Sequence, residues 1–366
     1  MSTLKVEVVT IDDVQKHPNA DRLDCLIVKG WNVVAAKGHV PGEKVAYVPI
    51  DSILPPPLEA HLFPPDSKVK LSKSRVRTIK LRGAISQGMI IPLDDLINFD
   101  PEFSEARVGD DLTARLGITK YEPPEDSVPD HMRPHHSPKL SNPWFRKYTD
   151  IEHFKNHNRL FEPGEHVYIT EKLHGTSARY GMLPTAPRKW WQKLLKFLHL
   201  LPDHEFCIGS RNVHLQAQGN KCFYDSNVYA KMAKFHRLAD VLQPGEILFG
   251  EIVGDGIQKG YTYGCRQGEH DFYAYDVMIN GEYLDAPDFV KWCDLRHIPR
   301  VPVYYWGVFD DALKGLAKGD SVIGGQKVRE GIVIKPSIER NTHMGRKVLK
   351  LINEDYELAK DNSDFH

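Results

Sequence analysis

A lysine between a β-rich run and a turn of small residues is the first feature of this sequence that suggests chemistry. The stretch EKLHGTS covers residues 171–177, and Lys172 lies near its start. A lysine partly withdrawn from water loses its proton more easily and can act as a nucleophile. Gly175 lets the backbone approach a ligand closely, while Thr176 and Ser177 offer hydroxyl donors to phosphate oxygens. A surface lysine before a turn gives the same short pattern, so its meaning depends on the rest of the chain.

Further short blocks follow the lysine in a definite order: an arginine turn, a carboxylate strand, an aromatic strand, a second carboxylate strand and a lysine strand. They are SRN (210–212), LFGEIVG (248–254), FYAYDV (272–277), REGIVIKP (329–336) and KVLKLIN (347–353). This order resembles the covalent nucleotidyltransferases, which are the polynucleotide ligases and mRNA capping enzymes. It is most similar to RNA ligases, in which K-x-H-G-T-S or K-x-D-G, G-E-I-x-G and E-G-I-V-I-K recur. The resemblance covers the chain from about residue 146 to its end.

The resemblance implies that ATP is the nucleotide and that Lys172 attacks its α-phosphate to form a phosphoramidate with AMP. It also implies that Glu171 reads the adenine amino group and that Arg211 holds the ribose or a phosphate. Tyr275 occupies the place of the aromatic residue that stacks on adenine, and Tyr273, on the same face by strand alternation, is the alternative. For the arginine and the tyrosines, a purely structural role is the competing interpretation.

The same resemblance implies a divalent cation, Mg²⁺ or Mn²⁺, held by Glu251 and Glu330, which otherwise would be ordinary ion-pair partners. Magnesium prefers oxygen ligands and keeps several waters, and it offsets charge that develops on the phosphate. Lys350 is expected to neutralise the α-phosphate in the transition state. Alternation places Lys347 on the opposite face, where we expect it to be solvated. His174, where many relatives have Asp, is expected to form a hydrogen bond rather than to add charge to a metal site.

The first ~100 residues are mostly short β-rich runs separated by Gly, Pro and Asp-Ser turns. These runs are residues 4–11, 25–37, 44–50, 76–81 and 88–93. Five short strands with long connections favour a small OB-type barrel, and a sandwich fits almost as well. DNA ligases and capping enzymes carry an OB domain after the core, whereas here only about 13 residues follow KVLKLIN. A domain in front resembles the fifth RNA-ligase family, of which the run 76–93 is typical.

The predicted fold class is therefore α+β. We expect an OB-type β-barrel at residues 1–118, a linker rich in Pro, Ser and His at 119–145, and a nucleotidyltransferase domain at 146–366. The last is expected to be an ATP-grasp-like adenylation domain of antiparallel sheets and helices, with helices at 150–157 and 227–242. The amphipathic stretch 188–201 predicts a packed helix with a wet basic edge, or alternatively one that contacts a membrane or a nucleic acid.

A basic stretch in the N-terminal domain indicates a nucleic-acid partner. Residues 68–82 hold seven Lys or Arg and no acid. Such a strand on a small barrel can follow a phosphate backbone, and the residues predicted to do so are Arg75, Arg77, Lys80 and Arg82. The alternative is a solubilising edge strand, which lysine commonly protects.

Composition limits the cellular setting. Five dispersed cysteines (Cys25, Cys207, Cys222, Cys265 and Cys293) without a C-x-x-C pair favour reduced thiols over disulfides or a zinc site. The sequence has no apolar run long enough to span a membrane, and its start lacks the apolar region of a secretory signal. We therefore expect a cytoplasmic or nucleocytoplasmic protein without a membrane partner. The net charge of -1 neither predicts nor excludes nucleic-acid binding.

The resemblance implies joining of a 3′-hydroxyl to a 5′-phosphate in RNA, at nicks in duplexes, through a lysyl-AMP and an adenylylated 5′-end. The expected partner is RNA or an RNA-containing duplex with a nick, clamped by the OB domain, and no oligomer is predicted. One alternative is another enzyme, a DNA ligase or a GTP-using capping-type nucleotidyltransferase. A second alternative is a non-enzymatic nucleic-acid-binding protein in which the OB module acts alone.

Overall fold

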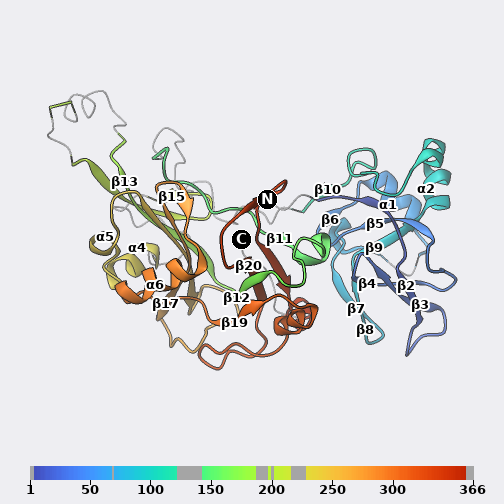
Figure 1. Ribbon diagram of the computed structural model, residues 1–366. Coiled ribbons are helices and arrows are strands. Elements are labelled where there is room, and N and C mark those ends of the chain that lie inside the picture. The colour runs from blue at the N-terminus through green and yellow to red at the C-terminus, as the bar shows by residue number, and fades with distance from the viewer. Residues whose placement is uncertain are drawn as a thin grey trace. The chain divides into compact units, whose positions relative to one another are not determined.

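The computed structural model describes residues 4–67, 70–121, 142–186, 197–198, 202–215 and 228–359 (Figure 1). The chain forms two compact units, one of Met1–Pro123 with Glu152–Asn158, the other of Pro124–Ile151 with Arg159–His366. The expected helix at 150–157 is wrong, because this stretch forms the short strand β11 (Glu152–His153) and a 3-10 helix, Phe154–His157. The expected helix at 188–201 lies outside the described residues apart from Phe197 and Leu198, which are exposed.

The N-terminal unit is built from short antiparallel strands with two small helices. Its sheets have the orders β1-β5-β9, β2-β3-β4, β7-β8 and β10-β6. The run 25–37, expected as one strand, is part of the hairpin β3-β4, because Lys29 and Gly30 have φ of 52° and 77° and so turn the chain. The elements are β1 (Glu7–Thr10), β2 (Asp13–Lys16), β3 (Leu23–Val28), β4 (Trp31–Ala36), β5 (Lys44–Val48), β6 (Ser52–Ile53), α1 (Pro56–Leu62), β7 (Thr78–Leu81), β8 (Ala84–Gln87), β9 (Met89–Pro92), α2 (Leu93–Phe99) and β10 (Thr119–Lys120).

The segment Glu152–Asn158 belongs to the N-terminal unit because it packs around one tryptophan. Trp31 is 3% exposed, and its indole N–H donates to Asn156 Oδ1 over 3.1 Å. The ring of His153 lies 4.5 Å from the Trp31 ring, and Lys155 Nζ donates to Gln87 Oε1 over 2.8 Å. The unit therefore includes residues that stand some thirty positions beyond β10 in the sequence.

Two antiparallel sheets form the C-terminal unit, and the α+β prediction is confirmed. One sheet contains the order β23-β20-β12-β19, and the other has the order β15-β14-β13-β16-β17-β18 (Figure 1). The blocks expected as strands from the sequence overlap with four of these strands, β16, β17, β20 and β23. The strands are β12 (His166–Lys172), β13 (Thr176–Pro184), β14 (His204–Ser210), β15 (His214–Leu215), β16 (Glu246–Gly254), β17 (His270–Ile279), β18 (Glu282–Tyr283), β19 (Val303–Val308), β20 (Gly331–Pro336) and β23 (Leu349–Ile352), with a small hairpin of β21 (Asn341–Thr342) and β22 (Gly345–Arg346).

Helices cover one face of the six-stranded sheet, where the main core lies. Tyr229 and Met232 of α4 (Val228–Phe235) and Phe289 of α6 (Ala286–Arg296) pack with apolar residues of β13, β16 and β17. The helix expected at 227–242 is two helices, because Arg237 adopts a left-handed conformation before α5 (Leu238–Val241). The C-terminal helix α7 (Glu354–Glu357) follows β23. This core packs against β16 and β17, which carry two of the ordered blocks of the sequence.

Candidate active site

Lys172 stands where the chain passes from one sheet to the other. It is the last residue of β12, and after the turn 173–175 the chain enters β13 of the six-stranded sheet. Lys172 pairs with Gly331 of β20, directly after Glu330. Its Nζ donates to Glu330 Oε1 over 2.5 Å, and the side chains are 24% and 6% exposed, respectively. The lysine therefore faces an acid in a largely covered position instead of bulk water.

A second acid, Glu251, reaches the same place from the six-stranded sheet. It lies on β16 opposite Ser177. Burial raises the pKa of the Glu251 carboxyl to about 8; Glu330 raises it further, whereas Lys172 and Arg211 lower it. These four side chains thus interact electrostatically although they come from four separate blocks of the sequence.

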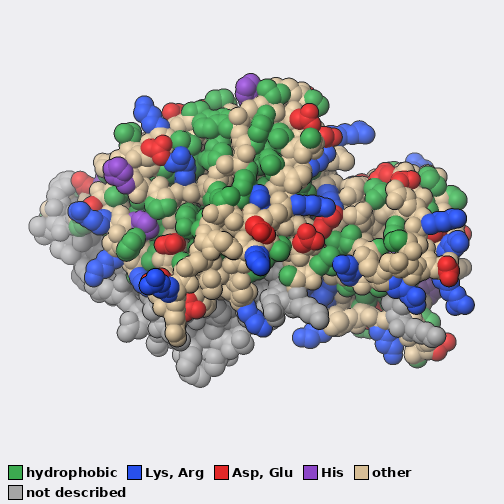
Figure 2. Space-filling model, turned by 90° about the horizontal axis from the view of Figure 1, so that it is seen from below, with side chains coloured by type: hydrophobic (Ala, Val, Ile, Leu, Met, Phe, Trp, Pro, Cys, Tyr) green, Lys and Arg blue, Asp and Glu red, His purple; other side chains and the backbone are tan. Residues whose placement is uncertain are grey.

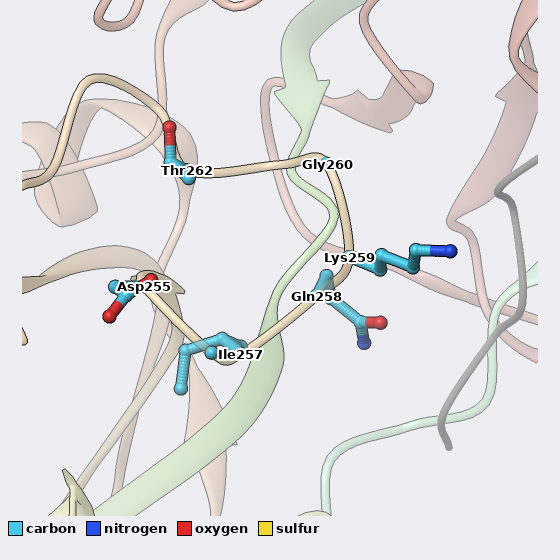
Figure 3. Close-up of a pocket in the computed structure, with 7 residues that line it drawn as sticks. Asp255, Ile257, Gln258, Lys259, Gly260 and Thr262 are labelled. Carbon is cyan, nitrogen blue, oxygen red and sulfur yellow. The ribbon is translucent and has the colours of Figure 1, made fainter. Parts of the chain in front are cut away.

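Gly175 allows the lysine turn to lie against β16. A Cβ on Gly175 would stand 2.3 Å from the Ile252 carbonyl oxygen and 2.8 Å from Glu251 Cγ, so any larger residue would push the strand and the turn apart. Gln258 Nε2 donates to the Gly175 carbonyl over 2.9 Å. Gln258 belongs to the loop 255–262, which borders a pocket of about 400 Å³, with Lys259 pointing outward (Figure 3). The loop thereby supports the turn from the side.

His174 is held by tyrosines. It is 3% exposed, its backbone N–H donates to Tyr263 Oη over 2.7 Å, and its Nδ1 lies 3.0 Å from Tyr356 Oη. The rings of Tyr261 and Tyr356 stand edge-on to the imidazole at 4.9 and 5.2 Å. The prediction that this residue forms a hydrogen bond is confirmed, with Tyr356 of α7 as partner.

Tyr275 and Tyr273 both lie beside the acids, at a bulge of β17. Phe249 pairs with Asp276 and Gly250 with Ala274, so Tyr275 is the extra residue between them. Tyr275 Oη lies 2.9 Å from Ser177 Oγ, and burial raises the pKa of its phenol well above the usual range. Tyr273 pairs with Glu251, and burial raises its pKa to about 12. Both rings remain partly exposed, so both are available to an aromatic ligand.

Glu171 points to the other face of β12 from Lys172, because successive residues of a strand alternate. It is 1% exposed, and Tyr304 Oη donates to its Oε2 over 2.5 Å. Burial raises the pKa of the Glu171 carboxyl, although hydrogen bonds and Arg329 act in the opposite direction. Ser321 and the Val322 backbone act on the carboxyl too, but among the described residues no hydrogen bond of regular geometry reaches its buried Oε1.

The two lysines of the last block have different surroundings. Lys350 pairs with Val333, and Val333 pairs with Thr170, so strand register places Lys350 on the same face as Lys172. The expectation that Lys347 is solvated is wrong: it is 8% exposed, and its Nζ lies 2.8 Å from Glu165 Oε2. Glu165, which is distant in the sequence, forms an ion pair with Lys347 inside the protein. The spacing of the two lysines did not reveal this partner.

Arg211 follows β14 in a turn. Its side chain is 53% exposed and lies 2.5 Å from Asp150 Oδ1. The positive charge of Arg211 lowers the pKa of the Glu251 carboxyl, so Arg211 interacts electrostatically with this acid although its side chain is largely exposed. An exposed arginine in this position can reorient toward a phosphate or ribose.

The four cations predicted to follow a phosphate backbone divide into one engaged in an ion pair and three exposed. Arg75 lies 2.5 Å from Asp51 Oδ1 and 3.6 Å above the Tyr121 ring. Arg77, Lys80 and Arg82 are exposed on and beside β7, which with β8 forms a hairpin. Figure 2 shows basic and acidic side chains interspersed over the visible face, consistent with a net charge near zero.

Sequence reasoning missed a buried charge network behind Tyr275. Asp276 is fully buried and lies 2.7 Å from an Arg346 nitrogen and 3.2 Å from Lys335 Nζ. Tyr148 Oη donates to Asp276 Oδ2 over 2.7 Å. The available signal was an acid inside an otherwise apolar strand, since a buried carboxylate requires partners. Tyr304 carried no such signal.

Comparisons with known proteins identify the family and the fold. The model of the RNA ligase family matches residues 165–352, and a model of an OB-fold domain matches residues 5–93. Since the first match spans more than half of the chain, the protein belongs to the RNA ligase family, and it carries an N-terminal OB-fold domain. Both predictions from the sequence are thereby confirmed. No curated protein matches the sequence.

Solved structures of a Naegleria gruberi RNA ligase share the fold along almost the whole chain. A variant with ATP and Mn is 23% identical, with a TM-score of 0.70 over 96% of this chain and 98% of that one. The structure with PPi is 24% identical, with a TM-score of 0.70 over 97% and 98%. Another variant, with AMP and Mn, is 24% identical, with a TM-score of 0.71 over 97% and 98%. None of the helices in the described part of this chain has the length and apolar character needed to cross a bilayer.

Proposed function

We propose that this protein is an ATP-dependent RNA ligase that joins a 3′-hydroxyl to a 5′-phosphate through AMP covalently held on Lys172. The observation that carries the proposal is the placement of Lys172 Nζ 2.5 Å from Glu330, beside Glu251, at the junction of two sheets. Membership of the RNA ligase family and the likeness to ligase structures that contain ATP, AMP and Mn support it.

In the first step, Lys172 Nζ forms a bond to the α-phosphorus of ATP, and the bond from that phosphorus to the bridging oxygen of pyrophosphate breaks. The amine must give up a proton to form the phosphoramidate, and Glu330, which already accepts a hydrogen bond from Nζ, is placed to receive it. Lys350, on the same face of the sheet, is placed to offset charge on the α-phosphate.

Glu251 and Glu330 fit a hydrated Mg²⁺ or Mn²⁺ ion. Both supply hard oxygen ligands, and the pKa of Glu251 is raised by burial and by Glu330, as expected for two acids that share a small space. The described residues contain no cluster of three or more His, Cys, Asp or Glu suited to a metal, so such an ion would keep waters as ligands. When bound, the ion would offset negative charge on the phosphates.

The remaining residues would hold the nucleoside. Tyr275 would stack on adenine, with Tyr273 as the alternative, since both are partly exposed beside the acids. Glu171 would accept a hydrogen bond from the adenine amino group at its buried Oε1. Arg211 would leave Asp150 to hold ribose or phosphate.

The later steps transfer AMP to the 5′-phosphate of RNA and then expel it when the 3′-hydroxyl attacks that phosphate. We propose nicks in RNA-containing duplexes as the substrate, with the OB-fold unit gripping the duplex. Arg77, Lys80 and Arg82 are the exposed cations suited to phosphates. Replacing all three with alanine should preserve AMP loading and weaken joining, and the difference from wild type should shrink at higher salt, because the variant makes fewer phosphate contacts.

Labelling tests the first step. Wild-type protein incubated with ATP labelled at the α-phosphate should carry label through a denaturing gel, and GTP should give none. Lys172→Ala should abolish the label. Lys234→Ala, which removes an exposed lysine of α4, is the matched control and should retain it. Label that survives in Lys172→Ala, or that comes from GTP and not ATP, would overturn the proposal.

Nick sealing tests the substrate. Matched duplexes that differ only in a ribose or deoxyribose at the 3′-hydroxyl end should be sealed at clearly different rates, with ribose preferred. Equal sealing of both would argue for a DNA ligase, whereas AMP loading without any sealing would exclude joining as the function.

A further inference from the structure

Tyr304 is the partner of the acid assigned to adenine, and it reaches that acid through a bulge. On β19, Tyr305 pairs with Ile169 and Val303 pairs with Thr170, so Tyr304 is the extra residue. Bulges re-aim a side chain out of the regular alternation. Here the phenol is aimed at Glu171 and donates to its Oε2 over 2.5 Å.

The other side of the Tyr304 ring is also fixed. The guanidinium carbon of Arg329 lies 4.0 Å from the ring centroid, and Arg329 itself donates to the Leu316 carbonyl over 3.0 Å. A ring stacked under an anchored arginine and bonded through its hydroxyl has little freedom to turn. The carboxylate that accepts its bond is therefore fixed as well.

Orientation of this carboxylate leaves one oxygen for a ligand. Glu171 is 1% exposed; Oε2 is occupied by Tyr304, while Oε1 forms no hydrogen bond of regular geometry among the described residues, although Ser321 and the Val322 backbone also act on this carboxyl. A buried acceptor without a donor is costly, and a ligand N–H that reaches it is favoured strongly. An exocyclic amino group supplies that hydrogen, whereas a carbonyl at the same position would be repelled.

We propose that Tyr304 is a positioning residue for base recognition: it holds Glu171 so that Oε1 accepts a hydrogen bond from the 6-amino group of adenine. The protein thereby selects 6-aminopurine nucleotides over purines that lack this group or carry a carbonyl there. This inference rests on the proposed use of ATP by the same site.

The test compares two ligands that differ only in the amino group. Full-length protein is first treated with pyrophosphate to remove any bound AMP, and calorimetry then gives the affinities for AMP and for purine riboside 5′-monophosphate. Wild type should bind AMP at least about tenfold more tightly, as expected for a hydrogen bond to a charged acceptor. Tyr304→Phe should weaken AMP binding by about tenfold and change purine riboside monophosphate binding by no more than about twofold.

Two further variants sharpen the comparison. Tyr305→Phe removes the neighbouring phenol, which bonds the Val308 carbonyl, and should leave both affinities unchanged. Glu171→Gln should keep its amide oxygen on Tyr304 and present N–H₂ to the base, which shifts preference from AMP toward inosine 5′-monophosphate with its 6-carbonyl.

The outcomes separate this inference from the proposed function. If wild type binds both nucleotides equally, or Tyr304→Phe weakens both alike, Tyr304 has only a structural role and the inference fails, while AMP loading on Lys172 can still stand. If wild type binds neither nucleotide and takes no label from ATP, the proposed function fails together with the inference.

Discussion

Replacing Asp276 with Asn should destabilise the C-terminal unit strongly, because it removes the negative centre of a buried charge network. Asp276 is fully buried between Lys335 and Arg346, whose side chains are each 4% exposed. Asn keeps the shape and leaves two buried cations facing a neutral amide. Breaking a buried ion pair from one side costs about 3–5 kcal/mol. For a unit of this size, that corresponds to a fall in Tm of roughly 6–20 °C.

Equilibrium unfolding in urea measures this cost, followed by a signal from the C-terminal unit. The control is Asp240→Asn, which breaks an ion pair to Arg237 with side chains 78% and 67% exposed and should change stability by less than about 0.5 kcal/mol. A second readout is AMP affinity, because Lys335 Nζ donates to the Tyr275 carbonyl over 3.2 Å and Tyr148 packs on the Tyr275 ring. If Asp276→Asn unfolds within about 1 kcal/mol of wild type, the network is not desolvated and the reasoning is refuted.

Three further predictions address the turn, the N-terminal unit and acid pH. Gly175→Ala should slow single-turnover AMP loading by about 10²-fold, with the fold preserved by circular dichroism, because its Cβ would collide with Ile252 and Glu251; loading at the wild-type rate contradicts this. Trp31→Ala should cost about 3–5 kcal/mol of unfolding free energy and open 152–158 to proteases; unchanged cleavage there would mean that the segment does not depend on Trp31. Although burial alone would raise the pKa of the Asp276 carboxyl, Arg346 and Lys335 lower this pKa overall. The stabilisation that the Asp276 carboxylate contributes is therefore complete above the ordinary pKa of an aspartate, near ~3.9, and is lost as the pH falls toward the lower pKa of the folded state. The stability difference between wild type and Asp276→Asn should therefore shrink between about pH 5 and about pH 3, and a constant difference would exclude a lowered pKa.

Sequence alone predicted the parts of the fold that depend on local pattern. The blocks 248–254 and 272–277 lie within the strands β16 (Glu246–Gly254) and β17 (His270–Ile279), because long apolar and aromatic runs bounded by turns leave little choice. It failed where a tertiary partner decides the outcome. The apolar spacing of the stretch 150–157 predicts a helix. Contacts with Trp31 instead accompany a short strand and a 3-10 helix there. Strand alternation predicts that Lys347 faces solvent, but Lys347 forms an ion pair with Glu165.

The site itself shows why regular alternation was a useful but incomplete guide. Register alone places Lys350 on the same face of the sheet as Lys172, through the pairing of Val333 with Lys350 and with Thr170. Each sheet, however, contains a bulge next to the proposed nucleotide site, and at each bulge a tyrosine departs from the regular alternation.

Tyr275 is thereby set beside Ser177, and Tyr304 is set against Glu171. A bulge is a two-strand property: it exists only when a neighbouring strand fixes which residue is extra. A bulge therefore cannot be predicted from the sequence of a single strand. For this reason the positions of Tyr275 and Tyr304, the aromatic residue proposed to stack on the base and the one proposed to orient Glu171, could not be predicted from the sequence. In contrast, Lys172 ends a strand shortly before Gly175, Glu330 directly precedes Gly331, and Glu251 directly follows Gly250, so these residues leave a local signature in the sequence.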